Sequence, residues 1–262
     1  MSTAADLDFD RLLADRVALI TGAASGQGRA AALLFGAHGA KVVVADVNDD
    51  GSAETVRLLE ERGAEGIAVH ADVSQRPDID RMVAATVERF GYLNVLYNNA
   101  AVQMSGRLVD CTEEDWDLTI ATNLSAIFWA CRAALPALLD GGGSIINTAS
   151  TLGLIGSEGY AAYGAAKAGL VLLTKQLAVE YGPAVRANVI APGSIDTPRF
   201  RRVLEKTPGA AQFVEGLERT IPVRRLGVAE DVAAIALFLA SDQSAYISGA
   251  VLPADGGLAA LR

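Results

Sequence analysis

Seven short runs of apolar residues, rich in valine, isoleucine and leucine, alternate with helical patterns along the chain. Within each run the apolar residues are nearly continuous, which is typical of parallel strands that helices cover on both faces. The expected strands span residues 17–21, 41–46, 66–70, 93–98, 144–148, 186–191 and 250–253, and the expected helices lie near residues 28–38, 51–62, 76–90, 113–139, 162–181 and 229–240. The alternation predicts an α/β fold: a doubly wound parallel sheet of about seven strands with helices on both faces.

The chain is expected to form one domain, since it contains no internal repeat, no low-complexity tract and no linker rich in proline or serine. Residues 1–15 make a polar leader, and residues 16–262 make the catalytic domain. The pattern has one long break, from Pro192 to Pro222, with three prolines among its first seventeen residues. Because such segments are more often functional lids than structural loops, we predict a substrate lid at residues 192–222.

Composition excludes several classes of protein. The chain carries 22 lysine and arginine residues against 31 aspartate and glutamate residues, so its formal net charge is −9. Such a surface repels polyphosphates, and we expect no nucleic-acid partner. The two cysteines, Cys111 and Cys131, and the two histidines, His38 and His70, have none of the spacings that build a zinc site. We therefore expect no metal.

The N-terminal residues indicate where the protein resides. They include acidic side chains where a secretion signal needs positive charge followed by an apolar stretch. No uninterrupted apolar run of about twenty residues, the length that crosses a membrane, occurs in the chain. We expect a cytoplasmic protein with no membrane partner and with reduced thiols.

A glycine-rich turn, Thr21-Gly22-Ala23-Ala24-Ser25-Gly26-Gln27-Gly28, joins the first expected strand directly to a helix. In this context backbone N–H groups and the positive end of the helix dipole point at one place, where Rossmann-type folds bind a pyrophosphate. Three glycines alone are a weak pattern, and a glycine-rich connection without a ligand is the alternative. The strand before the turn and the helix after it favour the dinucleotide.

Asp46 ends the second expected strand, eighteen positions after Gly28. An acidic residue at about this offset accepts hydrogen bonds from the adenosine ribose and repels a 2′-phosphate. Because Ser25, Val47 and Asn48 offer no positive charge to bind that phosphate, the sequence predicts NAD(H). Asp46 as an ordinary loop residue is the alternative. Asp72-Val73, after the third strand, is a candidate clamp for the adenine ring, and Asp72 as a mere helix N-cap is its alternative.

Tyr163 and Lys167 lie four residues apart on an expected helix, so their side chains share one face. A phenol that titrates near 10 is a poor base at neutral pH, but a nearby ammonium group and an oxidised nicotinamide ring favour the phenolate. Tyr160 has Gly164 at the corresponding position and is expected in the pocket wall. Ser150 follows the fifth strand at the carboxyl edge of the sheet, where open α/β folds bind ligands, although such a serine is usually only a turn former.

Several motifs occur together in the order and spacing of one enzyme family. They are the turn at residues 21–28, Asn98-Asn99-Ala100, Asn123, Ser150, Tyr163, Lys167, and Pro192-Gly193 with Thr197-Pro198. On these residues the chain resembles the classical short-chain dehydrogenase/reductase family, from Val17 to about Asp255. Joint coincidence of these motifs is far less probable than coincidence of any one of them.

The resemblance implies a role for each matching catalytic residue. In the family the serine, matched by Ser150, hydrogen-bonds the substrate oxygen, and the tyrosine, matched by Tyr163, is the acid/base. The lysine, matched by Lys167, lowers the pKa of the tyrosine and grips the nicotinamide ribose. The asparagine, matched by Asn123, anchors a water that links the lysine to solvent.

The same resemblance extends to the cofactor. Thr197 resembles the residue that binds the nicotinamide carboxamide, and Asn99 and Ala100 resemble the segment that lines the ribose. The residues expected to contact the dinucleotide are Gly22, Ser25, Gly26, Gln27, Gly28, Asp46, Val47, Asp72, Val73, Asn99, Ala100, Tyr163, Lys167, Pro192, Gly193, Ile195 and Thr197. The chain departs from the family at Gln27, which replaces an apolar residue, at Ala101, which replaces glycine, and at Ala166, which replaces a frequent serine.

The expected substrate pocket is mostly apolar or aromatic, which favours an alicyclic, aromatic or medium-chain secondary alcohol over a sugar phosphate. Its candidate residues are Gln103, Met104, Leu152, Leu154, Ile155, Tyr160, Phe200 and Phe213, and core packing is the alternative for each. Arg199, Arg201 and Arg202 form a basic cluster at the start of the lid. This cluster either meets a carboxylate or a phosphopantetheine thioester or is a solvated helix face.

The expected helices at 124–139 and 162–179 carry almost no charge. One sheet face cannot bury so much apolar surface, so these helices indicate a partner subunit. Family members are commonly tetramers through the same two helices, and the resemblance therefore implies a homotetramer.

These observations predict an NAD(H)-dependent oxidoreductase that interconverts a small-molecule secondary alcohol and its ketone. Two alternatives stay open. A 3-oxoacyl-thioester reductase of the acyl-carrier-protein type shares the same residues but would favour NADPH. A catalytically silent NAD-binding sensor would usually lack the tyrosine or the lysine, and this chain has both.

Overall fold

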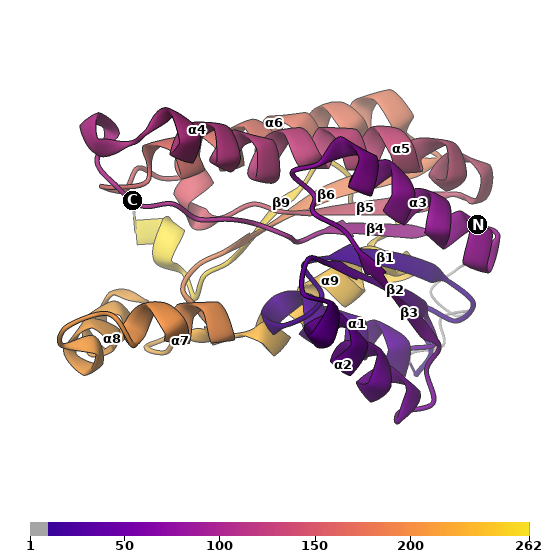
Figure 1. The fold of residues 1–262 in the computed structure, drawn as a ribbon, viewed down its shortest axis with the longest axis horizontal. Helices are drawn as coiled ribbons and strands as arrows, with labels where there is room; N and C mark the ends of the chain where they lie inside the picture. The colour runs from indigo at the N-terminus through magenta and orange to yellow at the C-terminus, as the bar shows by residue number, and fades with distance from the viewer. Residues whose placement is uncertain (1–9, 262) are drawn as a thin grey trace.

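The computed structural model describes residues 10–261 and contains one large sheet of parallel strands (Figure 1). The sheet has seven strands in the order β3-β2-β1-β4-β5-β6-β9. They are β1 (Val17–Thr21), β2 (Lys41–Asp46), β3 (Gly66–His70), β4 (Val95–Asn98), β5 (Gly143–Thr148), β6 (Val185–Pro192) and β9 (Val251–Ala254). The strand order reverses at β1, as in doubly wound sheets, so the predicted fold class is confirmed.

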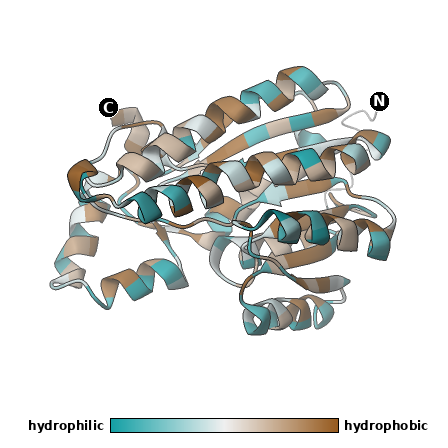
Figure 2. Cartoon of the chain, turned by 45° about the horizontal axis from the view of Figure 1, so that its top comes forward, coloured by the Kyte–Doolittle hydropathy of each residue, from teal (hydrophilic) through white to brown (hydrophobic). Residues whose placement is uncertain are grey.

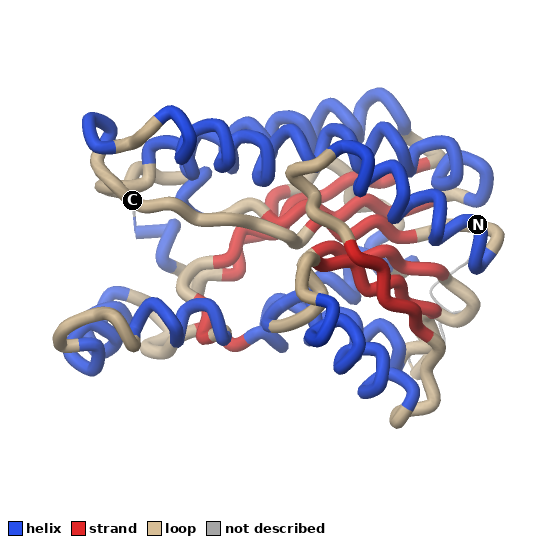
Figure 3. Tube along the Cα trace, viewed as in Figure 1, coloured by secondary structure: helices blue, strands red, loops and turns tan. Residues whose placement is uncertain are grey.

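Helices cover both faces of the sheet (Figure 3). The helices on one face are α1 (Gly26–Ala37), α2 (Asp49–Glu60) and α9 (Ala229–Ala240), and those on the other are α3 (Arg76–Phe90), α5 (Ala126–Gly141) and α6 (Ala161–Tyr181). Each face therefore has its own apolar core, and the strands between the two are predominantly hydrophobic (Figure 2).

Strand β1 shows how the sequence builds both cores. Its five residues are all buried. Because side chains alternate across a strand, Val17 and Leu19 pack into the core under α3, α5 and α6, while Ala18 and Ile20 pack into the core under α1 and α9. Each fully buried leucine or isoleucine contributes about 1.5–3 kcal/mol. The continuous apolar run is thus the signature of a strand with two buried faces.

The expected helix at 113–139 is a continuous helical segment with a π-helical turn inside it. It consists of α4 (Glu113–Ile120), a π turn (Ala121–Ser125) and α5. By length and composition alone, Glu113–Gly141 could cross a membrane, since an 18-residue window of it has a mean hydropathy of 1.3. Half of that window is buried inside the structure, as in the core helix of a domain.

The segment at 192–222 is more regular than its sequence pattern predicts. It holds β7 (Ile195–Asp196), which pairs with β8 (Gly227–Val228), and two helices, α7 (Pro198–Leu204) and α8 (Ala210–Thr220). The Thr197 side chain caps α7, and Pro198 stands in its first turn. Since β6 ends at Pro192, this segment lies beyond the carboxyl edge of the sheet, where the orange helices project in Figure 1.

The polar leader falls only partly within the described residues, since residues 1–9 lie outside them. Leu13 is fully buried in the core under α1, and its backbone N–H donates to the His38 carbonyl at 3.0 Å. Packing against the domain therefore begins before the boundary expected at residue 16.

Candidate active site

Three side chains singled out by the sequence meet at the carboxyl end of β5. Tyr163 and Lys167 lie one turn apart on α6, and the Lys167 Nζ atom is 5.6 Å from the centroid of the Tyr163 ring. Ser150, two residues beyond β5, hydrogen-bonds Tyr163. The Lys167 ammonium donates to the Thr148 carbonyl at 2.8 Å, which fixes it at the end of β5. All three side chains are buried.

The electrostatics of this cluster are governed by burial and by one arginine. Burial raises the pKa of Tyr163, whereas the positive charge of Arg199 and the hydrogen bond from Ser150 lower it. Burial, together with the positive charge of Arg199, lowers the pKa of Lys167 to about 7. The role expected of Lys167, a cation that favours the phenolate, stays a prediction, and Arg199 is a further cation that lowers the pKa of Tyr163.

Backbone packing sets the position of Ser150. Its hydroxyl oxygen accepts from the Leu152 N–H at 3.2 Å, so its own hydrogen is left to donate. Gly153 follows on the short 3-10 turn Thr151–Gly153, which packs on α6. A Cβ atom at Gly153 would lie 2.8 Å from the Lys167 Cβ and carbonyl carbon. Glycine therefore lets this turn, and Ser150 with it, approach Lys167.

Asn123 lies on the π turn between α4 and α5. Its amide nitrogen donates to the Val102 carbonyl at 2.9 Å and to the Thr119 carbonyl at 3.0 Å. Its Oδ1 atom is buried and has no hydrogen-bond partner among residues 10–261. A buried acceptor of this kind normally binds a partner or a water. The arrangement fits the expected role as a water anchor, which stays a prediction.

The glycine-rich turn leaves room and donors for a pyrophosphate. Gly22 has φ +67°, and a Cβ atom there would lie 2.8 Å from the Ala100 Cα. A Cβ at Gly28 would lie 2.2 Å from the Gly22 carbonyl oxygen. Ser25, the N-cap of α1, makes no side-chain cap, so the first N–H groups of that helix stay available to an anion. These residues fit a dinucleotide.

Segments after β4 and β6 close around this turn. The Asn99 amide donates to the Thr21 and Gly22 carbonyls at 3.0 and 3.2 Å, and the Thr21 hydroxyl accepts from the Asn99 and Ala100 N–H groups. Thr197 lies 3.6 Å from the position of a Cβ atom on Gly26. Thr21 was not among the expected residues, although a threonine that ends a buried strand beside a glycine turn is a polar group in need of partners.

Asp46 is held beside the turn, as expected of a residue near the ribose. Its carboxylate accepts from the Ala24 and Asn48 N–H groups, each at 3.0 Å. A carboxylate has about four acceptor sites, so two stay available to ribose hydroxyls. Arg29 is a cation that the sequence reading missed here. It is held on α1 by the Ala24 and Gly51 carbonyls and by the Thr55 hydroxyl.

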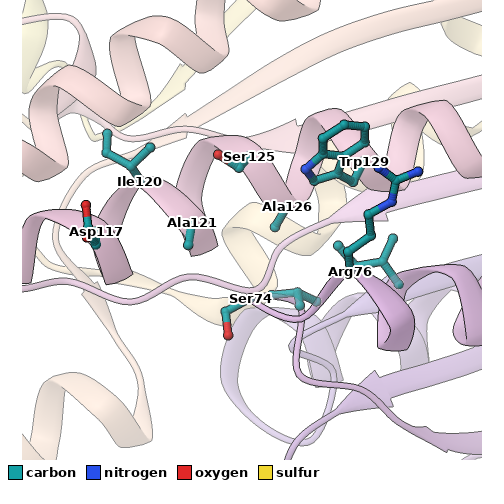
Figure 4. A pocket seen from close by; sticks show the side chains of 10 residues that line it. Ser74, Arg76, Asp117, Ile120, Ala121, Ser125, Ala126 and Trp129 are labelled. Carbon is teal, nitrogen blue, oxygen red and sulfur yellow. The ribbon is translucent and has the colours of Figure 1, made fainter. Parts of the chain in front are cut away.

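Asp72 does not cap a helix, so that alternative is wrong. Its carboxylate accepts from the Ser74 N–H at 2.9 Å, whereas the N-cap of α3 is Gln75. Neighbouring Val73 lines a cavity of about 320 Å³ between this loop and the α4–α5 segment (Figure 4). The Arg76 guanidinium stacks 4.0 Å from the Trp129 ring centroid in its wall. Ser150, Tyr163 and Lys167 do not line this cavity.

The structure brings together only part of the expected substrate pocket. The Gly106 N–H donates to the Gly159 carbonyl at 2.9 Å, which ties the loop of Gln103 and Met104 to that of Tyr160. Leu152, Ile155, Tyr160 and Phe200 are half-buried, whereas Gln103, Met104, Leu154 and Phe213 are exposed. Phe213 on α8 is 46% exposed. The lid residue that affects Tyr163 is Arg199, whose charge lowers the pKa of the phenol.

The three arginines of the basic cluster have different surroundings. Arg201 is exposed and makes two 2.8 Å hydrogen bonds to the Asp196 carboxylate. Arg202 is exposed on the same helix. Arg199 is half-buried and turns inward, where its Nη1 atom donates to the Ala101 carbonyl at 3.1 Å. The cluster is therefore not one solvated face.

Comparison with known proteins gives likenesses that span nearly the whole chain. Residues 22–259 match the family model described as enoyl-(acyl carrier protein) reductase. A 3-oxoacyl-[acyl-carrier-protein] reductase of Thermotoga maritima is 39% identical over 248 residues, 94% of this chain and 98% of that protein. Trans-4-hydroxycyclohexanecarboxylate dehydrogenase of Sinomonas cyclohexanicum is 39% identical over 252 residues, 94% of this chain and 93% of that protein.

A solved structure agrees in fold as well as in sequence. The crystal structure of levodione reductase superposes with a TM-score of 0.92 at 36% identity, covering 95% of this chain and 100% of that one. The likeness therefore includes the sheet and the helices on both of its faces, over almost the whole of both chains.

Proposed function

The chain belongs to the short-chain dehydrogenase/reductase family, a family of oxidoreductases, and we propose that it interconverts a secondary alcohol and its ketone with NAD(H). The observation that carries the proposal is the meeting of Ser150, Tyr163 and Lys167 at one buried point at the carboxyl end of β5. A hydroxyl, a phenol and an amine so arranged are suited to acid–base chemistry on an alcohol oxygen.

Each side chain has a separate task in this proposal. The glycine-rich turn at residues 21–28 and Asp46 would hold the nicotinamide cofactor, which when bound would supply the acceptor for the hydride, the carbinol hydrogen with the electron pair of its C–H bond. The Ser150 hydroxyl donates to the substrate oxygen and orients it. The Tyr163 phenolate takes the substrate O–H proton as the C=O bond forms, and reduction returns it. Lys167 and Arg199 supply positive charge that favours the phenolate, and Asn123 Oδ1 offers an acceptor for a relay water.

The preference for NAD(H) rests on Asp46. Its carboxylate is held beside the glycine turn with acceptor sites left over, and its negative charge opposes a 2′-phosphate. Arg29, a cation that contacts the same glycine-rich turn, already donates to two carbonyls and a hydroxyl.

For the substrate we propose an alicyclic, aromatic or medium-chain alcohol. The half-buried candidates near the site, Leu152, Ile155, Tyr160 and Phe200, are apolar or aromatic. The name of one relative, a hydroxycyclohexanecarboxylate dehydrogenase, contains such an alcohol. A 3-oxoacyl-thioester reductase is the second candidate, because a relative of that name is equally identical to this chain.

The test is Tyr163→Phe. Removal of the phenolic hydroxyl should lower kcat by about 10²- to 10⁴-fold, while NADH binding, measured by its fluorescence, persists. The matched control is Tyr181→Phe, at the far end of the same helix, which should keep the wild-type rate. Activity is followed as nicotinamide absorbance over a panel of secondary alcohols with NAD and, separately, NADP. Normal turnover by Tyr163→Phe refutes the mechanism, and a preference for acyl-carrier substrates with NADPH selects the second candidate.

A further inference from the structure

Arg199 is a cation placed beside the reacting groups, and no carboxylate among residues 10–261 forms an ion pair with it. It stands in the first turn of α7, two residues after Thr197. Its guanidinium donates to the Ala101 carbonyl at 3.1 Å, in the loop that follows β4. The side chain therefore spans from the lid to the carboxyl edge of the sheet. Its charge acts on both Tyr163 and Lys167.

The contrast with other lid arginines is chemical. Arg201 and Arg219 on the lid, and Arg225 just beyond it, each form an ion pair with a carboxylate, although all three are well exposed. Arg202, which is exposed on α7, forms no ion pair among residues 10–261. Among residues 10–261, no ion pair involves Arg199, which is more buried than they are. Burial lowers the pKa of Arg199, the phenol of Tyr163 raises it in part, and the nearby charge of Arg202 lowers it again, so on balance the site disfavours the charge that Arg199 holds.

An unpaired, half-buried guanidinium is costly unless an anion satisfies it. Arginine has five N–H donors in a planar fork, and the contact with Ala101 uses one of them. The remaining donors suit a carboxylate, which a guanidinium binds through two parallel hydrogen bonds. A substrate that carries both groups would place its carboxylate at Arg199 and its reacting hydroxyl at Ser150. The apolar side chains around the site would contact the part of the substrate between them.

We propose that Arg199 binds a carboxylate on the substrate, so that the preferred substrates are secondary alcohols or ketones that also carry an acid group. This inference rests on the proposed function and narrows its substrate class. A cofactor phosphate offers similar anionic chemistry. The donors suited to that phosphate lie at Gly26 and the uncapped first turn of α1, whereas the charge of Arg199 is felt at Tyr163, the reacting end.

The first experiment compares 4-hydroxycyclohexanecarboxylate with its methyl ester, which has the same ring and hydroxyl but no charge. The ratio of kcat/KM for acid over ester should be about tenfold or more in the wild type and should fall about tenfold in Arg199→Leu, with Arg199→Lys between them. Arg202→Leu is the matched control, because it removes the same charge from the same helix, and its ratio should equal that of the wild type.

Two results of this comparison would overturn the proposal. One is an acid-to-ester ratio near one in the wild type, or a ratio that falls equally in Arg199→Leu and Arg202→Leu, which would indicate a long-range effect of charge. The other is an unchanged ratio in Arg199→Leu together with weaker NADH binding, which would assign Arg199 to a cofactor phosphate.

A second experiment tests the carboxylate site without turnover. If the enzyme oxidised no alcohol, the proposed function would be refuted, but this binding experiment would still test the carboxylate site. Cyclohexanecarboxylate lacks the reacting hydroxyl, and its binding to the enzyme saturated with NADH can be measured by calorimetry. Binding by the wild type and Arg202→Leu that weakens about tenfold in Arg199→Leu supports the carboxylate site. Lack of binding by the wild type, or equal binding by all three proteins, overturns it.

Discussion

Lys167 is a fully buried amine, and its burial has a consequence for stability that is independent of catalysis. Its pKa falls from 10.5 to about 7 in the folded chain. As the pH drops from 10.5 to 7, the unfolded chain therefore binds a proton at this position while the folded chain does not. As the pH is lowered through that window, the free energy of unfolding should decrease. Below the window it should stay constant, because both states are then protonated.

The variant Lys167→Met keeps the bulk of the side chain and removes the titration. Its free energy of unfolding relative to wild type should rise as the pH is lowered from 10.5 to about 7 and then stay constant. Urea unfolding of both proteins at several pH values measures this difference. A difference that does not vary across the window would contradict the lowered pKa.

Asp46 determines the second prediction at this scale. In Asp46→Ser the carboxylate that opposes a 2′-phosphate is gone, and the ratio of kcat/KM for NADP over NAD should rise about tenfold or more. Asp50→Ser removes an exposed acid close by in sequence and should leave the ratio unchanged. The two cofactors are compared by initial rates on one alcohol. An unmoved ratio in Asp46→Ser would remove the basis for assigning NAD(H).

Local spacing explains which residues could be proposed from sequence. Tyr163 and Lys167 lie one helical turn apart, so their meeting follows from the helix alone. Arg199 lies 36 positions after Tyr163, and its approach depends on how β6 and α7 fold back. The sequence shows the arginine cluster, but it does not distinguish Arg199, which turns inward, from Arg202, which is exposed. The roles of these residues stay predictions.

At the scale of elements, the glycine-rich turn at residues 21–28 packs so closely that we can predict how a substitution there changes stability. A methyl group at Gly28 would lie 2.2 Å from a backbone oxygen, which cannot move aside without breaking the turn. Gly28→Ala should therefore cost about 1–3 kcal/mol of stability and weaken NADH binding.

Gly216 is the matched control for that substitution. It lies inside α8, where an added Cβ atom would meet no heavy atom within 4 Å. Gly216→Ala should stabilise the protein by about 0.5–1 kcal/mol, since alanine loses less backbone entropy in a helix. Denaturant unfolding of both variants checks the pair. Equal effects of the two substitutions would mean that the close approach at Gly28 is not a constraint.

The elements that sequence could predict are those buried on both faces. The continuous apolar runs gave all seven strands, with ends shifted by at most two residues, because burial on two faces demands apolar residues throughout. The π turn at Ala121–Ser125 contains no glycine or proline that would mark it in the sequence. Helices α7 and α8 contain no buried residue, so neither packs into the two cores that give the other helices their apolar pattern, although α8 is amphipathic.

For the whole molecule, the exposed apolar surface indicates self-association. Phe128 on α5 is 46% exposed, and Leu172 and Val179 on α6 are 61% and 80% exposed. Both helices cover the same sheet face (Figure 1), and each carries exposed apolar side chains. Apolar groups gathered in this way usually mark an interface between subunits.

Because the family resemblance implies a homotetramer, we expect the wild type to have four times the chain mass of 27.2 kDa. The double variant Phe128→Arg, Leu172→Arg should shift the mass toward that of smaller species, since buried unpaired charges at an interface are costly. Val203→Arg on α7, an equally apolar exposed position outside these helices, is the control and should keep the wild-type mass. Sedimentation or light scattering measures the masses. A wild type that sediments as a single 27.2 kDa chain would show that these apolar faces are solvent-exposed in the native molecule.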